Sequence, residues 1–318
     1  MRAVTIRDEK IVIEEHPDPV PAKGEVLVRV RAAGLNGGDI SQRRGLYPAP
    51  PGSPQDIPGM ELAGEVAALG AGAERFAEGD RVMAVVGGGG QAELAVVNER
   101  LLMPVPAALE WPAAGGLPEV FTTAHDALIT QAGLRSGERL LVHGGAGGVG
   151  TAAIQLARAA GASATATVRR ADLHDQVTRL GAEVLAPEDF ASHGPFDVIL
   201  ELVGAPNLQD DMQALGTGGR IAVIGVPAGA KAELNLLALM GKRARIHGST
   251  LRARSLEEKA LTARRLEHEV LPLFESGALE VPVAEAFPLD QAAAAYERFE
   301  AGGKLGKVVL VMTDARAA

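Results

Sequence analysis

The 318-residue chain contains no cysteine. This absence excludes disulfide bonds, cysteine nucleophiles and cysteine-ligated zinc. The seven histidines show no H-E-x-x-H or other paired spacing, so each is predicted to be structural. No G-x-S-x-G motif is present either, and Ser-His-Asp catalysis therefore has no support.

Basic residues are outnumbered, with 31 Lys and Arg against 40 Asp and Glu and a net charge of −9. This balance argues against nucleic acid or an anionic membrane surface as the main partner. The N-terminal residues lack the apolar core of a signal peptide. Residues 140–157 carry no charge, but their five glycines favour a loop over a membrane span. The sequence therefore predicts a cytoplasmic protein.

The length predicts two domains. The first third is rich in alternating β patterns, although the glycines and prolines of residues 34–58 predict a long loop. From residue 139 onward, short apolar runs alternate with helical stretches, which predicts a parallel, doubly wound sheet. Residues 245–249 are predicted to add an edge strand, and residues 255–276 to form one long amphipathic helix.

A glycine-rich turn follows the apolar run at residues 140–142, and a helical pattern follows the turn at residues 151–160. Strand, glycine turn and helix form the context in which a G-x-G-x-x-G spacing predicts dinucleotide binding. Glycine permits the tight turn and the close approach of a pyrophosphate to the helix N-terminus. The predicted cofactor-binding residues of this turn are Gly145, Ala146, Gly147, Gly148, Val149 and Gly150.

Two arginines, Arg169 and Arg170, follow the second predicted strand of this region. An NAD site would carry an acidic residue about 20 residues past the glycines, to bind the ribose 2′-hydroxyl. Arginine instead suits a 2′-phosphate, through charge-assisted hydrogen bonds. The pair predicts NADPH as cofactor, with two solvated loop arginines as the alternative.

Several segments resemble the medium-chain dehydrogenase/reductase superfamily, and within it the zinc-free quinone oxidoreductases, which include zeta-crystallin. Apart from the glycine turn, the matching segments are residues 34–39, 44–48, 58–61, 79–82, 123–128, 248–254 and 306–310. The zinc-dependent relatives hold a catalytic zinc with a cysteine and a histidine. The matching positions here are Asn36 and Met60, so the resemblance implies no metal.

The resemblance implies an α/β fold, with a Rossmann doubly wound parallel sheet and a β-rich GroES-like catalytic domain. Residues 1–119, completed by residues 264–318, would form the catalytic domain, and residues 120–263 the NADPH-binding domain. The active site would lie in the cleft between them. A homodimer is also implied, with the strand near residues 245–249 as the candidate pairing edge.

The predicted catalytic residues are Tyr47 and Asn36. The Tyr47 hydroxyl could donate to a quinone oxygen, or the side chain could only pack in its loop. Asn36 could bind the ribose or the substrate, or serve as a turn residue. Thr123 matches a position near the nicotinamide, although its hydroxyl could be satisfied within its helix. Val203 and Gly225, near the ends of later strands, complete the predicted cofactor set.

The predicted activity is zinc-independent transfer of a hydride from NADPH to a quinone. Such a reaction requires mainly that the two rings are held together, because positioning alone supplies roughly 7–11 kcal/mol of the barrier. Reduction of an enone or enoyl double bond is the alternative enzyme activity, so the expected substrate is a small quinone or enone. A non-catalytic NADPH-binding protein is the third possibility.

Overall fold

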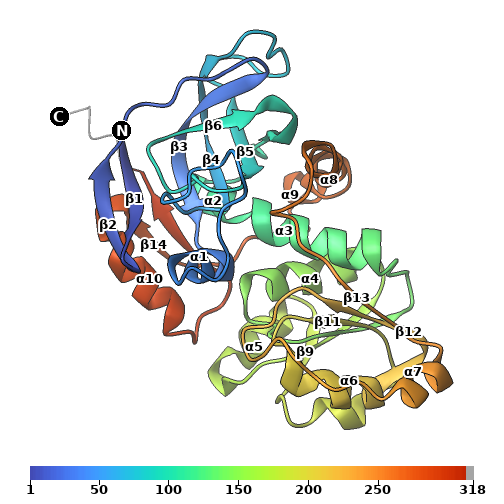
Figure 1. Cartoon of the computed structure of the whole chain (residues 1–318). Helices are drawn as coiled ribbons and strands as arrows, with labels where there is room; N and C mark the ends of the chain where they lie inside the picture. Colours follow the sequence, from blue (N-terminus) through green and yellow to red (C-terminus); the bar gives the residue numbers. More distant parts are fainter. Residues whose placement is uncertain (313–318) are drawn as a thin grey trace. The chain divides into compact units, whose positions relative to one another are not determined.

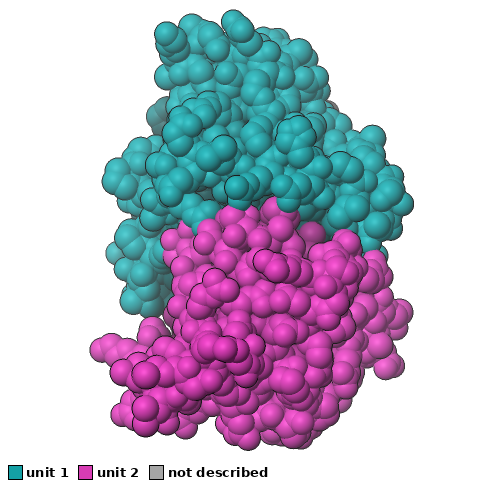
Figure 2. All heavy atoms as spheres, turned by 90° about the vertical axis from the view of Figure 1, so that its right-hand side faces the viewer, with its two compact units in different colours: residues 1–122, 251–302, 307–318 teal, residues 123–250, 303–306 magenta. Residues whose placement is uncertain are grey.

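The structure is a computed structural model that describes residues 1–312 and divides into two compact units (Figures 1 and 2). Unit 1 contains residues 1–122, 251–302 and 307–312, drawn in teal in Figure 2. Unit 2 contains residues 123–250 and the short segment 303–306, drawn in magenta. The chain therefore leaves unit 1, builds unit 2 and returns.

The unit boundaries differ from the predicted domain boundaries in three places, the smallest difference being that the first part of unit 1 ends at residue 122 and not at residue 119. Helix α8 (Leu256–Glu269), which the prediction divided between the domains, belongs to unit 1. Within that unit Glu257 forms an ion pair with Arg100, with 2.5 Å between Oε1 and Nη1. The segment ending at Gly306 belongs instead to unit 2, because the Gly306 N–H donates to the carbonyl oxygen of Ala146 at 2.8 Å.

Unit 2 is built on a six-stranded parallel sheet with the order β10-β9-β8-β11-β12-β13. This order confirms the predicted doubly wound sheet. It reverses between β8 and β11, and ligands of such sheets bind at the carboxyl ends of the strands beside this reversal. The strands are β8 (Arg139–Val142), β9 (Ser163–Thr167), β10 (Ala182–Leu185), β11 (Phe196–Glu201), β12 (Leu215–Val223) and β13 (Arg245–Gly248).

Helices cover both faces of this sheet, and Figure 1 shows α4 and α6 on opposite faces. The face that carries α6 and α7 has a core that includes Leu141, Ile199 and Ile221. β13 forms the edge of the sheet, as predicted. The helices are α4 (Gly148–Ala159), α5 (His174–Arg179), α6 (Leu208–Ala214) and α7 (Leu236–Lys242), with short 3₁₀ turns η3 (Ala171–Leu173), η4 (Phe190–His193) and η5 (Ala205–Asn207).

Unit 1 contains the predicted β-rich domain. Its main sheet has the order β14-β15-β3-β4-β5-β7, with β6 also paired to β3, while β1 and β2 form a separate hairpin. β15 lies beside β3, so residues 307–311 join the sheet that the first third of the chain forms. The strands are β1 (Arg2–Arg7), β2 (Lys10–Glu15), β3 (Glu25–Gly34), β4 (Glu61–Leu69), β5 (Arg81–Val85), β6 (Leu94–Asn98), β7 (Met103–Pro104), β14 (Val283–Pro288) and β15 (Lys307–Val311).

The helices of unit 1 are short apart from α8. Helix α3 (Pro118–His125) crosses the boundary of the units and continues in unit 2 as the π-helix η2 (Asp126–Gln131). The others are α1 (Gly37–Arg43), η1 (Glu99–Leu101), α2 (Trp111–Gly116), α9 (Leu271–Glu275), η6 (Leu289–Gln291) and α10 (Ala292–Glu300). Among residues 1–312, no helix combines the length and the apolar character needed to cross a bilayer.

The predicted loop at residues 34–58 is confirmed for residues 44–58, while residues 37–43 form α1, whose first turn is closed by a capping box between Asn36 and Asp39. Those two side chains satisfy backbone N–H groups that a loop would leave to water. The predicted long helix at residues 255–276 is two helices, because Pro272 has no N–H for the helical ladder and ends the continuous pattern.

Candidate active site and dinucleotide site

The glycine turn of unit 2 joins β8 to α4 and leaves the start of α4 without a side-chain cap. A Cβ at Gly145 would lie 2.6 Å from Ala166 Cβ, and one at Gly150 would lie 2.5 Å from the Gly144 carbonyl oxygen. Both positions therefore require glycine for packing. A Cβ at Gly147 would only contact the Gly144 carbonyl oxygen, at 3.4 Å, so packing within the protein does not require glycine at this position.

This arrangement fits a dinucleotide. One glycine of the motif serves the turn, one lets a pyrophosphate approach, and one lets the helix pack on the strand. Ala146, Gly148 and Val149 are half-buried, and the first N–H groups of α4 are available to an anion. Gly306 forms a parallel bridge with Gly147, so a C-terminal segment also lies beside the turn. Sequence reasoning missed this segment, since nothing local in the sequence pairs it with the turn.

Arg169 and Arg170 are exposed and follow β9. Arg170 forms a bidentate ion pair with Asp172, with 2.8 Å from Nε to Oδ1 and 2.6 Å from Nη2 to Oδ2. A Cβ at Gly303 would lie 2.6 Å from Arg170 Nη1, so this arginine also contacts the C-terminal segment of unit 2. Within residues 1–312, Arg169 has no hydrogen-bond or ion-pair partner.

The remaining predicted cofactor residues of unit 2 divide into two groups. Val203 follows β11 and Gly225 follows β12, which places both at the carboxyl edge of the sheet with the glycine turn. Thr123 lies instead on α3 and is buried, with 9% of its surface exposed. The structure thus brings the glycine turn, Val203 and Gly225 to one sheet edge.

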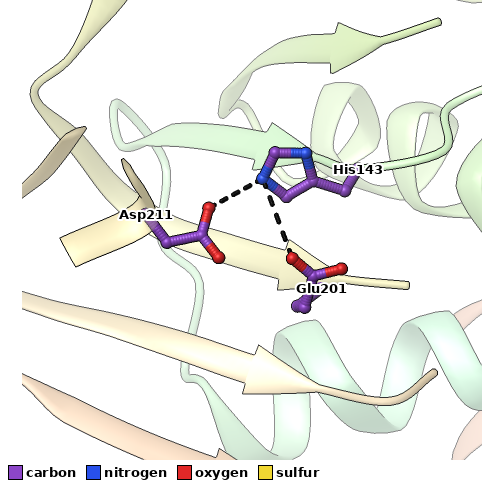
Figure 3. A group of neighbouring side chains, drawn as sticks. All are labelled: His143, Glu201 and Asp211. Carbon is purple, nitrogen blue, oxygen red and sulfur yellow. Dashed lines mark hydrogen bonds and ion pairs between the residues drawn. The ribbon is translucent and has the colours of Figure 1, made fainter. Parts of the chain in front are cut away.

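Next to this edge, the buried side chains of His143, Glu201 and Asp211 form a polar cluster (Figure 3). His143 Nε2 is 2.8 Å from Asp211 Oδ1 and 4.0 Å from Glu201 Oε2, and all three side chains are at most 4% exposed. Burial, as the largest cause, raises the pKa of Asp211 to about 6, while His143 opposes the shift and Glu201 adds to it. The sequence predicted only a structural role for His143, and the cluster is formed by residues that lie far apart in the chain.

In unit 1, Asn36 belongs to a second buried network. Its Nδ2 donates to Glu61 Oε1 at 2.9 Å, and its Oδ1 accepts from Lys307 Nζ at 2.7 Å. Lys307 and Glu61 form an ion pair at 2.7 Å with exposed side-chain fractions of 3% and 0%. A Cβ at Gly34 would lie 2.3 Å from Glu61 Oε1, so this network also needs a glycine. The Asn36 amide is held by protein partners.

Asp39 closes the network from the side of α1. Its two carboxylate oxygens accept the N–H groups of Asn36 at 2.8 Å and Gly59 at 3.0 Å. Complete burial raises the pKa of this carboxyl to about 6, against the opposing effect of those hydrogen bonds. Asp39 thus fixes the backbone at Asn36, and sequence reasoning assigned it no role.

Tyr47 is partly exposed, and its hydroxyl has no hydrogen-bond partner in the described chain. The Arg252 guanidinium lies 5.0 Å from the centre of its ring, and Arg252 Nη1 donates to the Tyr47 carbonyl oxygen at 2.8 Å. Burial first, and then the charge of Glu119, raises the pKa of the Tyr47 hydroxyl above 10.0, with Arg252 acting in the opposite direction. The hydroxyl is therefore a proton-bearing donor at neutral pH.

A Rossmann sheet with a glycine turn, combined with a β-rich unit completed by the C-terminus, defines a nicotinamide-dinucleotide oxidoreductase of the two-domain type. Residues 22–107 match the alcohol dehydrogenase GroES-like domain, and residues 180–310 match the family described as zinc-binding dehydrogenase. The quinone oxidoreductase of Rattus norvegicus is 32% identical over 306 residues, which cover 92% of this chain and 91% of the relative.

Two further similarities extend the comparison. A spectinabilin polyketide synthase system protein of Streptomyces orinoci is 34% identical over 308 residues, covering 92% of this chain and 13% of that protein. The crystal structure of an NAD-dependent alcohol dehydrogenase has a TM-score of 0.87 at 29% identity, covering 98% of this chain and 100% of that one. The chain belongs to the zinc-free quinone oxidoreductase branch of the medium-chain dehydrogenase/reductase superfamily.

Proposed function

We propose that the protein is an NADPH-dependent quinone reductase that works without zinc. The observation that carries the proposal is the glycine turn, in which the start of α4 has no side-chain cap and a Cβ at Gly147 would meet only the Gly144 carbonyl oxygen. The similarity to quinone oxidoreductases over nine-tenths of the chain supports the choice of acceptor. Unit 2 would bind the dinucleotide along the carboxyl edge of its sheet.

The proposed preference for NADPH depends on Arg169 and Arg170. Arg169 is exposed and unpartnered within residues 1–312, so it can bind a 2′-phosphate without breaking an existing contact. Arg170 would have to exchange Asp172 for the phosphate, or bind with Asp172 still attached to one side of its guanidinium. Because a guanidinium has five N–H donors, the second arrangement is also possible.

In unit 1 we assign the direct contact with the acceptor to Tyr47. When bound, NADPH supplies a hydride, and one added proton completes the two-electron reduction of a quinone to a hydroquinone. Tyr47 would donate its O–H to the quinone oxygen that gains negative charge, which lowers the energy of the transition state. Asn36, whose amide is held by Glu61 and Lys307, would shape the site and bind no substrate through its side-chain nitrogen.

Reduction of an enone or enoyl double bond is the second candidate function. The similarity to a polyketide synthase system protein favours it, because it reaches 34% identity across the same 92% of this chain. The free hydroxyl of Tyr47 would serve an enone carbonyl equally well. An experiment therefore has to distinguish reduction of a quinone from reduction of an enone or enoyl double bond.

The test is a turnover screen with the full chain. Oxidation of NADPH and of NADH is followed with 1,4-benzoquinone and with a 2-alkenal, and rates without protein are subtracted. Faster turnover of the quinone with NADPH supports the proposal. Turnover confined to the alkenal favours the second candidate, and NADPH binding without turnover of either acceptor indicates a non-catalytic protein.

A further inference from the structure

A chain of buried hydrogen bonds begins at the glycine turn of unit 2. The Gly144 N–H donates to Thr167 Oγ1 at 3.4 Å, and Thr167 Oγ1 lies 3.1 Å from His143 Nδ1. On the other side of the ring, His143 Nε2 lies 2.8 Å from Asp211 Oδ1. His143 directly follows β8, Thr167 ends β9, and Asp211 lies on α6.

This series of hydrogen bonds ends at the turn after β11. Glu201 accepts the N–H groups of Val203 and Gly204, the second at 2.7 Å, and accepts Asn207 Nδ2 at 3.0 Å. A Cβ at Gly204 would lie 2.5 Å from the Gly229 carbonyl oxygen, so this turn has no room for a side chain at that position. Glu201 therefore determines the backbone at Val203, one of the predicted cofactor residues.

The protonation states of the cluster determine how His143 and Asp211 are connected with Glu201. One placement of the protons gives both imidazole nitrogens of His143 a hydrogen bond: the Thr167 hydroxyl donates to Nδ1, and Nε2–H donates to Asp211. Asp211 Oδ2 then remains buried with no hydrogen-bond partner, and Figure 3 shows it on the side of Glu201. Burial and the neighbouring Glu201 raise the pKa of Asp211 to about 6, and a proton on Asp211 would let this oxygen donate to Glu201.

We propose that His143 is a positioning residue for dinucleotide binding, because it joins the glycine turn to the turn after β11 through Thr167, Asp211 and Glu201. The inference rests on the proposed binding of NADPH by unit 2. β8 and β11 are neighbours at the reversal of strand order, so their two turns border the place where such a sheet binds its ligand. Phe190 packs edge-on against the imidazole at 4.6 Å and fixes its orientation.

A metal ion is the rival explanation of the same cluster. One ligand atom from each of His143, Glu201 and Asp211 lies within 4.8 Å of the others. Against a metal, Nε2 and Oδ1 are already at hydrogen-bonding distance, and Glu201 already accepts three N–H donors. The existing hydrogen bonds thus account for nearly every polar atom without a cation.

The experiment compares variants of the full chain for NADPH affinity, KM values and thermal midpoint. His143→Phe keeps a ring against Phe190 but removes both nitrogens, and Asp211→Leu removes the link to Glu201. Asp211→Asn can still accept from Nε2–H and donate to Glu201, so it is the conservative rescue. Met212→Ala is the control. Met212 is a buried apolar residue next to Asp211 on α6, and it takes no part in the series of hydrogen bonds.

We expect His143→Phe and Asp211→Leu to weaken NADPH binding about tenfold, the effect of one lost buried hydrogen bond. The KM for the quinone should not change. Asp211→Asn should retain most of the affinity, and Met212→Ala should lower the thermal midpoint without affecting Kd. If His143→Phe does not fold, the Leu and Asn variants of Asp211 decide the question.

Three results would overturn the inference while leaving the proposed function intact. The first is equal NADPH affinity of the wild type and His143→Phe, and the second is equal weakening in Asp211→Asn and Asp211→Leu. The third is a stoichiometric metal whose removal reproduces the effect of His143→Phe. A wild-type protein that binds neither NADPH nor NADH would refute the proposed function itself.

Discussion

Arg252 both stacks on Tyr47 and donates a hydrogen bond to its backbone, with 5.0 Å to the ring centre and 2.8 Å to the carbonyl oxygen. The arginine is 2% exposed and also donates to the Gly87 carbonyl oxygen and to Gln42. A buried guanidinium with three acceptors is a rigid support. It holds the ring of Tyr47 while the hydroxyl stays free for a ligand.

Tyr47→Phe should lower kcat for quinones by roughly ten- to a thousandfold, because it removes a donor to the developing oxyanion. The Kd for NADPH should change little, since Tyr47 is assigned to the acceptor. Steady-state kinetics with several quinones and a fluorescence titration with NADPH test this. Unchanged kcat for all the quinones would assign Tyr47 a packing role only. Arg252→Lys serves as the companion variant, because it keeps the charge but loses the planar fork.

Activity should not depend on metal. The positions that hold zinc in the zinc-dependent relatives carry Asn36 and Met60, and the chain has no cysteine. The Asn36 amide is engaged by Glu61 and by the Lys307 ammonium group, a fixed positive charge in the network. Prolonged chelation should therefore leave turnover unchanged. Loss of activity that is restored by added zinc, together with one zinc per chain, would contradict this.

The sequence predicted well what local patterns determine. Apolar runs and the glycine spacing predicted the parallel sheet and its turn, because strand period and glycine geometry are properties of neighbouring residues. The sequence did not reveal the partners of the candidate site residues. Arg252 and Tyr47 are 205 positions apart, and Lys307 and Asn36 are 271 apart, so only tertiary folding brings them together.

The protein should form a homodimer through unit 2. Within residues 1–312, β13 is an edge of the parallel sheet with one unpaired side, and α7 exposes Leu236, Leu237 and Met240 by 64%, 79% and 69%. An unpaired edge beside exposed apolar side chains favours association. Light scattering should give about twice the 32.8 kDa chain mass, and Leu237→Glu should give monomers. A wild type that remains monomeric at micromolar concentration would exclude the dimer.

Stability should change with pH through Asp211. Burial raises the pKa of this carboxyl from 3.8 to about 6 in the folded state, so the folded protein binds the proton more tightly than the unfolded chain. The contribution of this proton to stability is fully present below about pH 4 and is lost as the pH rises through about 6. Of the titratable groups that face Asp211, His143 opposes this shift and Glu201 adds to it.

Asp211→Asn cannot lose a proton, so its stability serves as the reference. The difference in unfolding free energy, wild type minus variant, should fall by roughly 1–3 kcal/mol between pH 4 and pH 7. Urea unfolding across this range measures it, and the contribution of Asp39 cancels because both proteins retain it. A difference that stays constant with pH would mean that Asp211 titrates normally.

The last prediction concerns cofactor choice. NADPH carries a 2′-phosphate that NADH lacks, and Arg169 and Arg170 follow β9, where this phosphate would be bound. One engaged arginine should favour NADPH by roughly ten- to a hundredfold. Arg169→Ala should reduce that preference most, because Arg169 has no other partner within residues 1–312, whereas Arg170 is paired with Asp172. Asp172→Asn should then raise NADPH affinity by releasing Arg170, and NADH binding should stay nearly constant in both variants. Because exposed charges are screened, added salt should reduce the preference of the wild type for NADPH. Equal wild-type affinity for NADPH and NADH, at low and at high salt, would show that the two arginines do not select the cofactor.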